Sequence, residues 1–168
     1  VGWIFRDRKV NKKIILLTTI IFVILPFVTK LMCTNEFANW FYHKFGIEFN
    51  KFTMTRFSII NAVIDADFKN YGLGTVTNFL EQRGHQGQLN MHNDILMIYL
   101  DCTILGSIVF TYFNFKLSEQ SIYSYFVMLF IFFQMFVTHC LGSGTVIIWI
   151  MTYLLIYYFN RNVEVNKG

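Results

Sequence analysis

The stretch HNDILMIYLDCTILG (residues 92–106) joins a polar loop directly to an apolar segment. It opens with an imidazole and an amide, His92 and Asn93, and it carries a carboxylate, Asp101, inside the apolar run. Ionisable groups at the mouth of a membrane helix or within it are costly to place, so they mark candidates for function. These residues are the starting point for predicting both fold and function.

The composition predicts a membrane protein. Of 168 residues, 55% are hydrophobic, 19% are aromatic and 14% are charged, whereas about a quarter of the residues of a soluble domain are charged.

The chain begins at Val1 without a methionine or a signal-peptide pattern, which indicates a piece of a longer protein. The three cysteines, Cys33, Cys102 and Cys140, show no CxxC spacing, so we expect buried thiols rather than a disulfide or metal ligands.

Apolar segments predict membrane-spanning helices at residues 14–33, 95–115, 122–137 and 146–159. The first two are close to the length of about 20 residues that a span requires, and the last two are shorter. Residues 1–13 are rich in lysine and arginine, which marks the cytoplasmic side. Alternation then places residues 116–121 and 160–168 in the cytoplasm, and residues 34–94 and 138–145 outside. The predicted fold is an all-α integral membrane protein with about four transmembrane helices and both ends of the chain cytoplasmic.

The large external loop, residues 34–94, is expected to contain short amphipathic helices, because irregular backbone cannot face lipid. Its aromatic residues, such as Trp40 and Phe52, are expected at the membrane interface. Residues 57–64 carry apolar side chains at spacings of three and four, which predicts a helix lying on the bilayer or on neighbouring helices.

The loop shows no metal or nucleotide motif. The four histidines form neither HxH nor HExxH, and no GxxxxGK[ST] or GxSxG pattern occurs. We therefore expect no metal and no cofactor.

Two arginines and two histidines of the loop, Arg56, Arg83, His85 and His92, are candidates to converge on the outer surface. Arginine clamps phosphate through its bidentate fork, and a neutral histidine accepts a proton from a hydroxyl. Together they would suit transfer from a diphosphate-linked donor. The alternative is that the arginines contact lipid phosphates or solvent, while His92 and Asn93 cap the following helix.

Two stretches carry a resemblance to a known family. HNDIL (residues 92–96), followed by Asp101 and Gly106, resembles the signature of the O-antigen polymerase and O-antigen ligase family, in which His-Asn opens a membrane helix and an acidic residue and a Gly-x-x-Gly pair follow. Thr103 stands where the first of these glycines is usual. Upstream, TRFSII (residues 55–60) and YGLGT (residues 71–75) resemble the arginine helix and glycine turn of the same family. Members have ten or more spans, so this chain would correspond to the C-terminal part.

The resemblance implies a metal-independent glycosyltransferase on the outer face of a bacterial membrane, with an undecaprenyl-diphosphate-linked glycan as donor. It would polymerise oligosaccharide repeat units into capsule, exopolysaccharide or O-antigen. Arg56 would bind the diphosphate, and His92 would activate the acceptor hydroxyl or position the leaving group. Arg83 is a further candidate phosphate contact. Asn93 would orient His92 or cap the helix, and Asp101 would pair with an arginine, orient a neighbour or bond another span.

The expected partners are the lipid-linked oligosaccharide, the membrane, a chain-length regulator and a flippase, with no nucleic acid. Two other functions stay open. One is an O-antigen ligase that moves the finished glycan to lipid A core or protein. The other is a non-catalytic flippase component or transporter fragment whose loop binds glycan or lipid headgroups.

Overall fold

The computed structural model describes residues 9–66, 72–83, 91–138, 140–141 and 146–165. All regular elements in these residues are helices, which confirms the all-α fold class for the described part of the chain. They are α1 (Lys12–Met32), α2 (Asn35–Phe45), α3 (Phe49–Phe52), α4 (Arg56–Ile64), α5 (Thr75–Arg83), α6 (Asp94–Leu117), α7 (Ile122–Val137) and α8 (Val146–Val165).

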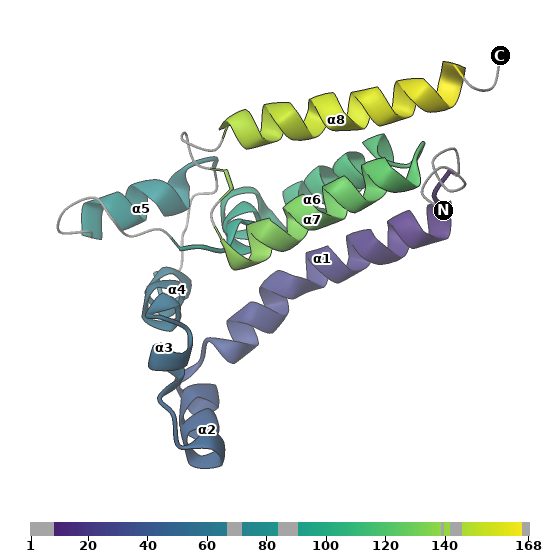
Figure 1. Cartoon of the computed structure of the whole chain (residues 1–168). Helices are drawn as coiled ribbons and strands as arrows, with labels where there is room; N and C mark the ends of the chain where they lie inside the picture. Colours follow the sequence, from purple (N-terminus) through teal and green to yellow (C-terminus); the bar gives the residue numbers. More distant parts are fainter. Residues whose placement is uncertain (1–8, 67–71, 84–90, 139, 142–145, 166–168) are drawn as a thin grey trace.

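The long helices α1, α6, α7 and α8 lie side by side (Figure 1). α1 packs on α6, α6 on α7, and α7 on α8. The beginning of α1 and the end of α8 lie at one end of this bundle, whereas α2, α3, α4 and α5 gather at the other end (Figure 1). The short helices therefore form a separate layer across the end of the bundle, which we call the loop end.

Among the described residues, two helices are long and apolar enough to cross a membrane, α1 with 21 residues and α6 with 24. α7 is apolar but has only 16 residues, which is slightly below the usual range of about 17–25 for a span. Helices thus occupy all four predicted segments, while length and composition support only two candidate spans.

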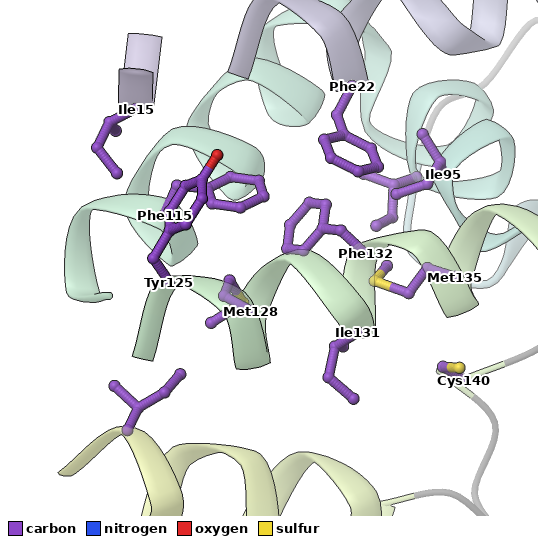
Figure 2. Close-up of a cluster of buried hydrophobic side chains, with 12 residues drawn as sticks. Ile15, Phe22, Ile95, Phe115, Tyr125, Met128, Ile131, Phe132, Met135 and Cys140 are labelled. Atoms are coloured by element: carbon purple, nitrogen blue, oxygen red, sulfur yellow. The ribbon is translucent and has the colours of Figure 1, made fainter. Parts of the chain in front are cut away.

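The bundle is held together by aromatic rings that come from three helices. Phe22 of α1, Phe115 of α6 and Phe132 of α7 lie with ring centroids 4.8–5.7 Å apart, and Figure 2 shows them converging between the helices. Such separations are favourable for aromatic pairs, which add about 0.5–1.5 kcal/mol beyond the burial of their area. The ring cluster holds α1, α6 and α7 together.

A second buried cluster joins the loop end to the bundle. Ile60 and Val63 of α4, Val76 and Leu80 of α5, and Leu96 of α6 are all buried in it. The apolar face predicted for residues 57–64 therefore packs on neighbouring helices, one of the two arrangements expected. The first turn of α6 is embedded among the short helices, and the loop end is not a detached domain.

α6 is bent rather than straight. Thr103 has φ 63° and ψ −179°, which is non-helical backbone in the middle of the element. Three residues later, a Cβ on Gly106 would overlap the Cβ of Cys102, so this turn depends on the missing side chain. The sequence predicted an uninterrupted span at residues 95–115, and the bend was not anticipated.

The three cysteines are free thiols, as expected from their spacing. Cys33 and Cys140 are buried, whereas Cys102 beside the bend is partly exposed.

Candidate functional site

A cavity of about 400 Å³ lies at the loop end of the bundle, where α1, α6 and α7 meet α3 and α4. Most of its walls are apolar and include Phe57 and Ile60 of α4 and Phe136 near the end of α7. Arg56, His92 and Asn93 also line it. A largely apolar hollow with a few convergent polar groups is the usual form of a ligand site.

Arg56 is the first residue of α4, and its Nη1 donates a hydrogen bond of 2.8 Å to the carbonyl oxygen of Val137. Val137 is the last residue of α7, where helix carbonyls lack partners within the helix. The bond fixes the partly exposed guanidinium at the cavity wall. Because a guanidinium has several donors in a planar fork, one such bond positions the group without using all of its capacity.

His92 stands immediately before the residue that caps α6. The backbone N–H of Leu96 donates to Oδ1 of Asn93 at 3.0 Å, so Asn93 is the N-cap of this helix. His92 is half-buried, with φ 51° in the left-handed region. The cap and the unusual backbone together turn the chain so that His92 lies at the cavity. The capping role expected of Asn93 is observed, and its contact with substrate stays a prediction.

Asp94 is a structural residue that the sequence analysis did not single out. The residue is 1% exposed, and its Oδ2 accepts hydrogen bonds from the backbone N–H groups of Cys140 and of Leu141, the latter at 2.8 Å. Trp149 of α8 donates to the carbonyl oxygen of Cys140 at 2.9 Å. This network ties the start of α6 to the connection between α7 and α8. The only sequence signal was an acid next to His92 and Asn93 at the start of an apolar run.

Asp101 holds the start of α5. Its Oδ2 accepts from the backbone N–H of Gly74 at 2.9 Å, and its Oδ1 accepts from that of Val76 at 3.0 Å. A carboxylate at a helix N-terminus satisfies N–H groups that lack helical partners and is stabilised by the helix dipole. Asp101 is 4% exposed and is not among the cavity-lining residues. Its carboxylate therefore bonds to the backbone at the start of α5, and the pairing with an arginine that was one of the expectations is not seen within the described residues.

Arg83 lies apart from this cavity. It is an exposed residue at the C-terminal end of α5, and its guanidinium carbon lies 4.6 Å from the centroid of the Phe79 ring. His85 and His139 fall outside the described residues. The structure thus brings Arg56, His92 and Asn93 to one cavity and leaves Arg83 and Asp101 away from its walls.

Within the described residues, no group of three or more His, Cys, Asp or Glu side chains is arranged to hold a metal ion. Cys33, one residue beyond the end of α1, also lines the cavity. Its thiol is free and buried.

No protein-family model matches the chain, and no match is found among curated proteins or solved structures. The family resemblance thus depends on the motifs around Arg56 and His92 alone.

Proposed function

We propose that this chain belongs to a metal-independent membrane glycosyltransferase that polymerises lipid-diphosphate-linked oligosaccharide repeat units on the outer face of a bacterial membrane. The observation that carries the proposal is that Arg56 and His92 line one cavity. These residues come from two separate motif matches and are far apart in the sequence. Their chemistry, a phosphate clamp and a proton acceptor, is what such a transfer needs.

The proposed membrane placement has support from the surface of the bundle. Large apolar side chains are exposed along α1, α6, α7 and α8, including Leu17 and Leu31 on α1 and Ile147 on α8. Contiguous apolar surface of this extent is unusual for a protein in water. We propose that all four helices span the membrane, with both ends of the chain cytoplasmic and α2 to α5 outside.

In the proposed mechanism, a hydroxyl of the incoming unit attacks the anomeric carbon of the growing glycan. The bond from that carbon to the lipid diphosphate breaks, and the configuration inverts. His92 accepts the proton of the attacking hydroxyl, and Arg56 stabilises the charge that develops on the departing diphosphate. Both groups act in a largely apolar hollow, where electrostatic stabilisation is stronger than in water.

The contacts around Arg56 and Asn93 are equally compatible with a second candidate, a non-catalytic protein that binds glycan or lipid headgroups. The guanidinium of Arg56 bonds to the Val137 carbonyl, and the amide of Asn93 caps α6. Both bonds serve the fold, and a protein without catalysis would need them as well. The two candidates differ in what they require of His92.

Glycan length separates these candidates. Cells that lack the gene encoding this chain are complemented with wild type, His92→Ala or Arg56→Ala at equal membrane levels. Polymerisation predicts long glycan from wild type and single repeat units from both variants. Full-length glycan that is not attached to its acceptor would indicate the ligase instead, and unchanged glycan would exclude a catalytic role for either residue.

The matched controls are His43→Ala and Arg83→Ala. His43 is exposed on α2, Arg83 is exposed on α5, and neither lines the cavity. Both controls are expected to support glycan of wild-type length. A defect from Arg83→Ala equal to that from Arg56→Ala would mean that the diphosphate is held outside this cavity.

A further inference from the structure

α2 differs from the longer helices of the structure because none of its eleven residues is buried. Figure 1 shows α2 and α3 extending from the loop end, across the direction of the long helices rather than along it. If the long helices cross a membrane, this direction runs along the membrane surface.

The residues of α2 separate into two faces. Phe37, Trp40, Phe41 and Phe45 recur at spacings of three and four, which places them on one face of the helix. The opposite face is polar and carries Asn35, Glu36, Asn39 and His43. Trp40 is 54% exposed and Phe45 is 55% exposed, so part of the apolar face is left without a covering element in the structure.

α2 and α3 form a preorganised unit. The ring of Phe49 in α3 lies 5.1 Å from that of Phe37 and 5.0 Å from that of Phe41. Thr34 caps the start of α2 by accepting from the N–H of Phe37 at 3.2 Å, and Gly46 ends it with φ 68°. Only Cys33 and Thr34 separate α2 from α1, which limits the directions that α2 can take relative to the bundle.

Exposed apolar side chains also occur on the helices that flank α2 in the chain. Leu31, in the last turn of α1, is 72% exposed. Phe52 of α3, whose ring centroid lies 5.2 Å from that of Phe41, is 61% exposed and also lines the cavity. Lys44 of α2 and Lys51 of α3 are exposed, and Lys51 also forms an ion pair with Glu48 at 3.1 Å. Exposed ammonium groups on such helices can reach anionic lipid phosphates.

We infer that α2 and α3 lie in the headgroup region of the outer leaflet, with Trp40, Phe45 and Phe52 inserted among lipids. The inference rests on the membrane placement in the proposed function. Its consequence is that α3 forms a rim where the cavity meets the bilayer surface, so that a lipid-linked substrate reaches Arg56 and His92 sideways from the membrane. Tryptophan is well suited to such a depth, because its ring is apolar and its N–H is polar.

Fluorescence quenching in proteoliposomes tests this placement. In the full-length protein, Trp3 and Trp149 are replaced by Phe so that Trp40 is the reporter within this chain, and any tryptophan elsewhere in the protein is replaced as well. Because Trp149→Phe removes the hydrogen bond to Cys140, the background is used only after its unfolding in detergent has been shown to match that of wild type. The lipids carry a nitroxide either near the headgroup or near the end of the acyl chain. We expect strong quenching of Trp40 by the shallow nitroxide, weaker quenching by the deep one, and little quenching by aqueous iodide.

A second reporter separates failure of this inference from failure of the membrane placement. Leu154 is exposed near the middle of α8, and Leu154→Trp in the tryptophan-free background should be quenched best by the deep nitroxide. If that holds while Trp40 is quenched by iodide or by neither agent, α2 faces water or protein and the inference is overturned alone. If both reporters escape the lipid nitroxides, the membrane placement fails and the inference fails with it.

Discussion

At the scale of single residues, the acids of α6 organise the loop end. Asp94 and Asp101 each accept backbone N–H groups from another part of the chain. A buried carboxylate is costly unless it is hydrogen-bonded, and these two are satisfied by the backbone at the start of α5 and at the connection between α7 and α8. They therefore fix both of these parts of the chain to α6, whose N-cap Asn93 directly follows His92.

Asp101→Asn is expected to lower the free energy of unfolding by about 1.5–3 kcal/mol, the usual contribution of hydrogen bonds to a charged group. The amide retains one carbonyl acceptor, but its NH₂ group would face a backbone N–H at Gly74 or Val76. Chemical unfolding in detergent measures the change. Asp65→Asn is the control, because Asp65 is exposed at the end of α4. Equal stability of the two variants would contradict the role assigned to Asp101.

The sequence indicated Arg56 and His92 through motifs, but their meeting in one cavity was not deducible from spacing, because it depends on how α4 docks on the end of α7. Asp101 was recognised as important without its partners. Its partners are backbone N–H groups, and backbone donors leave no signature in residue types. Asp94 was missed for the same reason.

At the scale of elements, the bend in α6 concentrates strain at one position. Thr103 has φ 63° and ψ −179°, a region that is occupied almost only by glycine and that costs other residues about 1–3 kcal/mol. A β-branched residue in a helical pattern gives no warning of such a bend, which is why the sequence predicted a continuous span. The glycine that is usual at this position in the resembled family would adopt this backbone without strain.

Thr103→Gly is therefore expected to raise the free energy of unfolding by about 1 kcal/mol, since relief of strain exceeds the entropic cost of glycine. Thr103→Ala keeps a Cβ and should bring no such gain. Unfolding in detergent compares the two variants. Stabilisation by alanine equal to that by glycine would show that backbone strain is not the cause.

Gly106→Ala is expected to destabilise the protein by about 1–3 kcal/mol, because the new Cβ would overlap the Cβ of Cys102. The overlap should disappear when Cys102 is also replaced by glycine. The double variant should thus lose less stability than the sum of the two single variants. Strict additivity in this double-mutant cycle would contradict the close approach.

At the scale of the whole molecule, the apolar segments of the sequence predicted where the long helices lie. The packing of the short helices, and the embedding of the start of α6 among them, came only from the structure.

The proposed topology predicts which side of the membrane each residue faces. With Cys33, Cys102 and Cys140 replaced by serine, Asn39→Cys on α2 should react with an impermeant thiol reagent on intact cells. Lys13→Cys on α1 should react only after permeabilisation. Labelling of both positions from outside would contradict four spans with both ends cytoplasmic.

Reconstitution with the natural substrate tests the central claim most directly. Lipids extracted from cells that lack the gene should contain the accumulated single repeat unit on its diphosphate carrier. Purified full-length protein is incubated with these lipids in proteoliposomes in the presence of EDTA, and glycan length is read on a gel. The proposal predicts a ladder of polymer from wild type and from His43→Ala, and none from His92→Ala. Single repeat units from all three proteins, or a ladder from His92→Ala as long as that from wild type, would contradict polymerisation at this cavity.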